Sequence, residues 1–153
     1  MQYIMDIGLN MINAEKYIKL FLKKKLAVYN LNATEGLILL LFLRFEHNTG
    51  EKAEMTQEII MQDLHYDKGI IARNMQSIER KGFVIRQSNP NDGRSSIFLL
   101  SDKANNVKNE LCAIVDELNR EVFRTFNPYK VEQLSKMIQS VSDNAWYYYN
   151  TIK

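Results

Sequence analysis

The sequence predicts a mainly α-helical protein that carries one small β-hairpin. Apolar residues recur every three or four positions over most of the chain, which is the period of an amphipathic helix. Two short β-rich runs bracket the turn sequence NPNDG at residues 89–93, a pattern typical of a hairpin. Two short helical segments directly precede these runs, so we expect a helix-turn-helix followed by a hairpin.

The length and composition indicate a globular protein. The chain has 153 residues, which suits one domain or one compact domain with attached helices. An apolar fraction of 46% argues against extensive disorder. The longest apolar run, Leu37 to Leu43, is too short to cross a bilayer, and the N-terminus lacks the basic region of a secretory signal. We therefore expect a soluble cytoplasmic protein with no membrane partner.

The composition favours no catalytic, cofactor or metal site. Cys112 is the single cysteine, which excludes an intramolecular disulfide, and His47 and His65 are too few for a closed Cys/His zinc site. The sequence has neither a Gly-rich phosphate loop nor a G-x-S-x-G motif. We interpret the acidic neighbours of the two histidines, Glu46 and Asp63, as solvated. An enzyme is therefore the least favoured class of protein, and we predict no catalytic residue and no cofactor.

Two helices and a polar loop are predicted in the first third of the chain. Residues 4–29 carry a broad apolar stripe and form the first helix. The stretch Asn32-Ala33-Thr34-Glu35 has the spacing of a capping box and starts the second helix. This helix continues through GLILLLFLRF, residues 36–45, which is apolar enough for a buried central helix. Residues 46–54 form the loop.

The two short helices that follow have recognisable start and stop signals. Thr56 is a good N-cap for the first of them, and its apolar face consists of Ile59, Ile60 and Leu64. Asp67 caps the second, which ends near Lys81, just before a glycine.

The second short helix has one apolar side and one cationic side. At about 100° per residue, Ile71, Met75 and Ile78 share one side and face the core. The opposite side contains no acidic residue, and its members are Gly69, Arg73, Gln76 and Arg80. Arginine and glutamine can form two hydrogen bonds to a base edge, although a solvated polar face is the simpler interpretation of this helix alone.

The runs at residues 83–88 and 96–100 form the strands of the hairpin, which makes the central segment a winged helix-turn-helix. Its residues 65–100 carry six basic and three acidic side chains, whereas the segments on either side are close to neutral. This positive charge is modest, and it is not the strong basic stripe of a non-specific nucleic-acid-binding protein.

Two long amphipathic helices complete the chain. Ser101 caps the first, whose apolar stripe extends from Val107 to Phe126, and Asn127-Pro128 starts the second. We expect the first helix of the chain and a second copy of the protein to bury these apolar faces. The predicted organisation is therefore an N-terminal dimerisation helix (1–31), a winged helix-turn-helix lobe (32–104) and C-terminal dimerisation helices (105–153).

Five motifs in this order resemble the MarR family of bacterial transcription regulators. They are Met55-Thr56, Asp67-Lys68-Gly69, Lys81-Gly82, Asp92-Gly93-Arg94, and Leu100-Ser101-Asp102-Lys103-Ala104. The sequence departs from the family pattern where Gly69 replaces a hydroxyl residue, Asn74 an apolar residue and Ala104 a glycine.

The resemblance implies a homodimeric regulator, and a repressor in particular, that binds a near-palindromic operator in double-stranded DNA. It also places Arg94 of the wing in a minor groove, whose negative potential attracts arginine. Asp92 would pair with Arg94 or a neighbour, or the two would form only an exposed ion pair. The DNA-binding residues that we predict are Thr56, Lys68, Gly69, Ile70, Arg73, Gln76, Arg80, Arg86, Asp92, Gly93 and Arg94.

A small lipophilic or phenolic effector is a further implication of the resemblance. Five aromatic residues are candidates for its pocket, although aromatic residues at helical spacing are more often part of a core: Tyr17, Phe21, Tyr29, Phe42 and Phe45. The alternative function is a winged-helix protein-interaction module that does not bind DNA, which the low overall charge and Gly69 favour.

Overall fold

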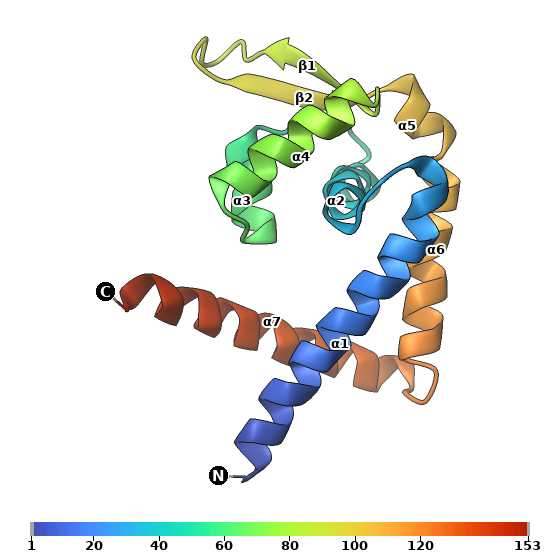
Figure 1. Ribbon diagram of the computed structural model, residues 1–153, viewed down its shortest axis with the longest axis vertical. Coiled ribbons are helices and arrows are strands. Elements are labelled where there is room, and N and C mark those ends of the chain that lie inside the picture. The colour runs from blue at the N-terminus through green and yellow to red at the C-terminus, as the bar shows by residue number, and fades with distance from the viewer. Residues whose placement is uncertain (1, 153) are drawn as a thin grey trace. The chain divides into compact units, whose positions relative to one another are not determined.

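The computed structural model describes residues 2–152, with side chains from residue 6 onward (Figure 1). Met1 and Lys153, the ends of the predicted N- and C-terminal segments, lie outside the described residues. The elements are α1 (Gln2–Leu26), a 3-10 turn (Ala27–Tyr29), α2 (Ala33–Thr49), α3 (Gln57–Leu64), α4 (Lys68–Arg80), β1 (Val84–Ser88), β2 (Ser96–Leu100), α5 (Asp102–Asn106), α6 (Lys108–Val122) and α7 (Pro128–Thr151). This mainly helical chain with a two-stranded hairpin confirms the predicted fold class.

The chain forms two compact units that meet within α6, after Val115. This boundary differs from the limits of the functional segments 1–31, 32–104 and 105–153, and that division stays a prediction. Within the described residues no single helix is long and apolar enough to cross a membrane, and only α1 and α2 together, bent by 83°, meet the length and composition criteria.

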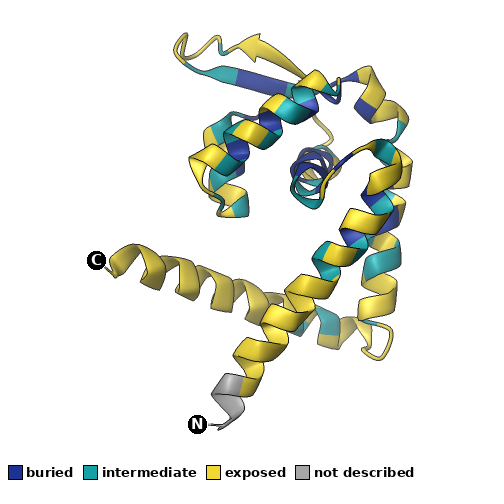
Figure 2. Cartoon of the chain, viewed as in Figure 1, coloured by how far each residue is buried: buried dark blue, intermediate teal, exposed yellow. Residues whose placement is uncertain are grey.

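Helix α2 is the centre of the first unit. Figure 2 shows dark blue and teal over much of it, and its Ile38, Leu39 and Phe42 are fully buried, whereas the residues near its C-terminal end are mostly exposed. The prediction of a buried central helix is therefore confirmed. Helices α3 and α4 pack beside α2, and Ile60 of α3 is fully buried in the core.

The hairpin is attached to this core through β2. Strands β1 and β2 pair antiparallel, from Val84 opposite Leu100 to Ser88 opposite Ser96. Met55, just before α3, forms a bridge with Phe98: its N–H donates to the Phe98 carbonyl at 3.1 Å, and it accepts from the Phe98 N–H at 2.8 Å. A two-stranded hairpin alone is marginally stable in water, so this bridge and the buried Phe98 ring hold the wing in place.

Side-chain caps start the helices where the sequence predicts them. Thr56, Ser101 and Asn127 each accept a hydrogen bond from the backbone N–H three residues later. Asn32 and Glu35 form both bonds of a capping box. Asp67 occupies the N-cap position of α4, but its side chain makes no cap hydrogen bond, so that part of the prediction is wrong.

Three further predictions about the helices need correction. The 25-residue α1 ends at Leu26, and the last residues of the predicted first helix form the 3-10 turn. Ile59, predicted to belong to the apolar face of α3, is 42% exposed. Helix α3 buries the side that contains Ile60, and Leu64 lies one turn further along that side, so Ile59 points outward. The helix after the wing breaks at Val107, whose φ of −107° and ψ of 10° are not helical; the two asparagines before it are poor helix formers.

The second unit, from Asp116 onward, leaves much apolar surface exposed. Phe123 and Phe126 pack edge to face, with ring centroids 6.4 Å apart, at the connection between α6 and α7. Among the described residues, none in α7 is buried, and Ile138 and Val141 of its predicted stripe are 46% and 45% exposed. The second unit by itself therefore does not bury the apolar side of α7.

Candidate nucleic-acid interface

Helix α4 has the two sides that its sequence predicts. Ile71, Met75 and Ile78 are fully buried against the core. On the opposite side Arg73, Gln76 and Arg80 are exposed, as is Gly69 in the first turn. Ile70 is half-buried, so only part of its side chain is available to a ligand. The outward face of α4 therefore carries cationic and amide groups in an open position.

A network of short hydrogen bonds fixes the turn of the wing. The Asp92 carboxylate accepts from the backbone N–H of Arg94 at 3.0 Å, and the Asp92 carbonyl accepts from the N–H of Ser95 at 3.0 Å. The Asn89 amide donates to the Ser95 hydroxyl at 2.8 Å across the turn. Asp92 therefore fixes the backbone of Arg94 and leaves the Arg94 guanidinium exposed; within residues 6–152 we find no ion pair between them. Gly93 needs no positive φ in this turn.

Arg86 is oriented by contacts within the hairpin. Its Nε donates to the Ser96 hydroxyl at 2.9 Å, and its guanidinium carbon lies 5.9 Å from the centre of the Phe98 ring. These contacts hold the cation beside the strand while the residue as a whole stays exposed. An arginine held in this way loses less side-chain entropy when it binds an anion.

The wing, the start of α3 and the start of α4 enclose a cleft of about 580 Å³. Five of the predicted DNA-binding residues line it, although they come from separate parts of the chain: Thr56, Lys68, Arg86, Asp92 and Arg94. Lys68, Arg86 and Arg94 outnumber the acidic lining residues Glu58 and Asp92. The cleft therefore has a net positive charge. In addition, the first turn of α3, next to the Thr56 cap, has backbone N–H groups without an intrahelical partner.

The cleft does not include all the predicted residues. Arg73, Gln76 and Arg80 lie along the outward face of α4 and are not part of its lining. Conversely, the lining includes residues that the sequence did not single out: Gln57, Glu58, Met61, Asn89, Ser95, Ser96 and Phe98. The hairpin register could have indicated Ser96, because it places that residue near Arg86 on the neighbouring strand.

The five candidate effector-pocket residues differ widely in burial. Phe42 is fully buried in the core, Phe21 and Tyr29 are half-buried, and Tyr17 and Phe45 are exposed, Tyr17 by 65%. Their grouping as a pocket stays a prediction. Within the described part of the chain no three His, Cys, Asp or Glu side chains are placed to hold a metal ion.

Comparison with known proteins places this geometry in a functional context. The family model described as transcriptional regulator SarA/Rot matches residues 20–111. The HTH-type transcriptional regulator BilQ of Clostridioides difficile (strain CD3) is 24% identical over 131 residues, which is 86% of this chain and 84% of that protein.

Solved structures of MarR regulators share the fold. A MarR transcriptional regulator from Methanosarcina mazei Go1 has a TM-score of 0.77 and 23% identity, over 91% of this chain and 95% of that one. A mutant MarR from E. coli, complexed with operator DNA, has a TM-score of 0.74 and 21% identity over 91% and 95%. The S. aureus MepR–DNA complex has a TM-score of 0.72 and 17% identity over 91% and 96%.

Proposed function

Because the chain belongs to the SarA/Rot family of transcriptional regulators, we propose that it is a homodimeric, cytoplasmic repressor that reads double-stranded DNA through α4 and the wing. Its winged-helix fold and its family confirm the resemblance to MarR regulators and the prediction that it is not an enzyme.

The observation that carries the proposal is the cationic cleft beside the outward face of α4. Lys68, Arg86 and Arg94 lie around one concave site, where a phosphate backbone can enter. Arg73 and Gln76 are exposed on the same helix as Lys68, outside the cleft lining, and such side chains can reach base edges in a major groove. The E. coli MarR and S. aureus MepR structures of the same fold were solved with DNA, which supports this assignment.

We assign each residue a role from its position. Arg73 and Gln76, with the exposed part of Ile70, read bases. Thr56, Lys68, Arg80 and Arg86 bind phosphates, and Arg94 enters a minor groove from a wing whose backbone Asp92 fixes. Phosphate contacts fix the position of a protein on DNA, whereas base contacts give specificity.

The exposed apolar faces support a homodimer. Ile12 of α1 is 62% exposed and Met137 of α7 is 62% exposed, and helices of this length need a partner for their apolar side. A two-fold pair would present two α4 helices to a near-palindromic site, with half-sites about 34 Å apart. A small lipophilic effector that binds near the aromatic residues of α1 and α2 would release the DNA by changing this spacing.

A gel-shift series tests the proposal. A duplex enriched from a random library by the wild-type protein is compared with a scrambled duplex of the same composition. Arg73→Ala is expected to lose about 1–3 kcal/mol on the enriched duplex only. Lys68→Ala is expected to weaken binding to both duplexes and to reduce the dependence of affinity on salt.

Arg124→Ala and Lys52→Ala are the matched controls, because both positions are exposed and lie outside α4 and the cleft. Equal affinity of the wild-type protein for the two duplexes would refute sequence-specific recognition. If the wild-type protein enriches no duplex from the library and binds none at low salt, the protein-interaction module is favoured instead.

A further inference from the structure

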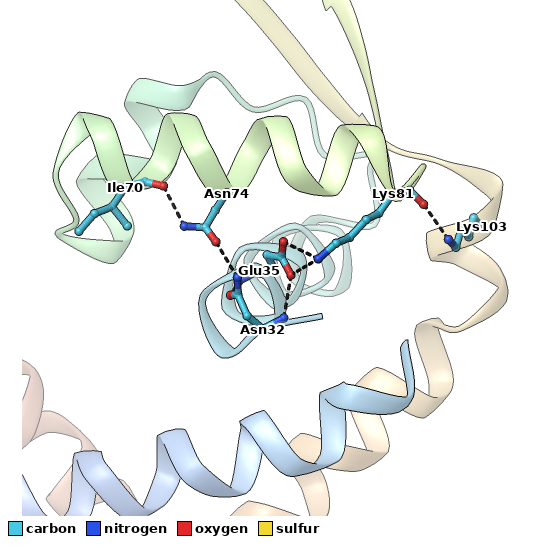
Figure 3. Close-up of polar contacts among 6 residues, drawn as sticks. All are labelled: Asn32, Glu35, Ile70, Asn74, Lys81 and Lys103. Carbon is cyan, nitrogen blue, oxygen red and sulfur yellow. Dashed lines mark hydrogen bonds and ion pairs between the residues drawn. The ribbon is translucent and has the colours of Figure 1, made fainter. Parts of the chain in front are cut away.

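The first turn of α2 contacts α4 at two separate points (Figure 3). The side-chain amide of Asn32 donates to the Asn74 side-chain oxygen at 3.1 Å. The Lys81 ammonium donates to both oxygens of the Glu35 carboxylate, at 2.7 Å each. One short turn, capped by Asn32 and Glu35 themselves, therefore holds the middle of α4 and the residue that ends it. We call these four residues the α2–α4 clamp.

The spacing of the clamp residues fixes how α4 is rotated. Asn74 and Lys81 are seven residues apart, which places them about 20° from each other around the helix axis and about 10 Å apart along it. The exposed residues Arg73 and Gln76 are about 100–160° away from Asn74 on the same helix. Two attachment points along one line prevent both rotation and sliding, so the clamp sets the direction of the outward side chains.

Burying a polar or charged group costs free energy unless it forms hydrogen bonds, and the clamp residues form them. The Glu35 carboxylate is 1% exposed, and it also accepts from the backbone N–H of Asn32 at 2.7 Å. The Asn74 amide donates to the Ile70 carbonyl at 2.9 Å, and the Lys103 ammonium donates to the Lys81 carbonyl at 2.6 Å. A buried ion pair is seldom more stabilising than an apolar contact of the same size, but it permits fewer alternative arrangements.

The same turn of α2 also receives the end of α1. Gly36, next to Glu35, is buried, and a methyl group in place of its hydrogen would overlap the side chain of Leu26. Leu26 is the last residue of α1 and is itself buried. The N-terminal helix and α4 are therefore attached to one turn.

We propose that Asn32, Glu35, Asn74 and Lys81 are positioning residues for DNA recognition. They touch no DNA; they hold α4 in the one rotation that directs Arg73 and Gln76 outward and connect it to the end of α1. This inference rests on the proposed function, because it assigns a purpose to the orientation of the reading helix.

Two clamp variants test the inference without leaving a charge buried. Asn74→Leu removes the first attachment, and the double variant Glu35→Gln/Lys81→Met removes the ion pair. Glu79→Gln is the control, since Glu79 lies on α4 outside both the clamp and the outward face. Circular dichroism first establishes that each variant is folded.

Two readouts are then compared. Spin labels at His47→Cys in α2 and Gln76→Cys in α4, in a Cys112→Ser background without DNA, report the distance between the helices. The clamp variants are expected to broaden or shift this distance distribution, and the control is not. In the unlabelled clamp variants, affinity for the enriched duplex is expected to fall about tenfold, because a misdirected side chain loses part of the discrimination that one bidentate base contact provides. Affinity for the scrambled duplex is expected to change less than twofold.

An unchanged distance distribution in both folded clamp variants would overturn the inference, and so would equal losses on the two duplexes. If the wild-type protein binds the enriched and scrambled duplexes with equal affinity, the proposed function is refuted, but the inference about the clamp is not. The label distances, which need no DNA, then decide whether the clamp holds α4.

Discussion

Replacing Lys81 by methionine is expected to destabilise the protein strongly, because it leaves the Glu35 carboxylate buried without its cation. The Glu35 side chain is 1% exposed and that of Lys81 is 24% exposed. Loss of one partner of a buried ion pair costs about 3–5 kcal/mol. Glu35 keeps its hydrogen bond from the Asn32 N–H, so we expect the lower end of this range, about 3 kcal/mol. For a chain of this size the melting temperature would fall by about 6–12 °C.

The pH dependence of this loss follows from the pKa of Glu35. Burial opposes ionisation of the carboxyl, but hydrogen bonds from Lys81, Ser77 and the Asn32 backbone outweigh burial and hold the pKa below its ordinary value of 4.5. Ionised Glu35 therefore stabilises the wild-type fold above that value, and this contribution is lost as the pH falls through the lowered pKa. In Lys81→Met burial is opposed only by the remaining hydrogen bonds, so we expect the pKa of Glu35 to be higher than in the wild type and the variant to lose stability relative to the wild type as the pH rises. The two proteins should differ most at pH 7, progressively less as the pH falls below 4.5, and least below the lowered pKa of Glu35.

Urea unfolding followed by circular dichroism at pH 7 and pH 4 measures this difference. The double variant Glu35→Gln/Lys81→Met is the control, and it should recover most of the stability because no buried charge remains. A loss below about 1 kcal/mol at pH 7, the value of an exposed pair, would refute the reasoning. A loss of equal size at pH 4 would also refute it.

Three other substitutions test separate parts of the account. Gly82→Ala places a side chain at a φ of +77° and is expected to cost about 1–2 kcal/mol of stability in urea unfolding, and no loss would show that the chain relaxes there. Arg94→Ala is expected to lower affinity most for duplexes with narrow A·T-rich minor grooves beside the site, and an equal loss on G·C-rich flanks would contradict the minor-groove role. Val141→Glu, which puts a charge on the exposed apolar side of α7, is expected to convert a dimer to monomers in sedimentation equilibrium, and an intact dimer would place the interface elsewhere.

Patterns that depend on near neighbours in the sequence predicted most of the fold. The core-facing side of α4, with Ile71, Met75 and Ile78, follows from the helical period alone. The turn residues between two β-rich runs located the hairpin, and the caps Thr56 and Ser101 located two helix starts. These signals lie within a few residues of the structure that they specify.

Contacts between distant residues could not be predicted in the same way. Asn32 and Asn74 are 42 residues apart, and Glu35 and Lys81 are 46 apart, so no periodicity relates them. Asn74 showed only as a departure from the pattern of the MarR family. The cleft was predicted only in part. The motifs indicated Lys68 and Arg94, whereas the other polar lining residues became evident only from the cleft that the wing and the start of α3 form together.

Hydroxyl-radical footprinting of the wild-type protein on its enriched duplex is the most direct test of the central claim, that α4 and the wing together form a DNA-reading surface presented twice. We predict two protected segments with centres about one helical turn apart, each flanked by a protected minor groove that becomes accessible in Arg94→Ala. A single protected segment, or uniform weak protection along the duplex that Arg94→Ala does not alter, would contradict the account.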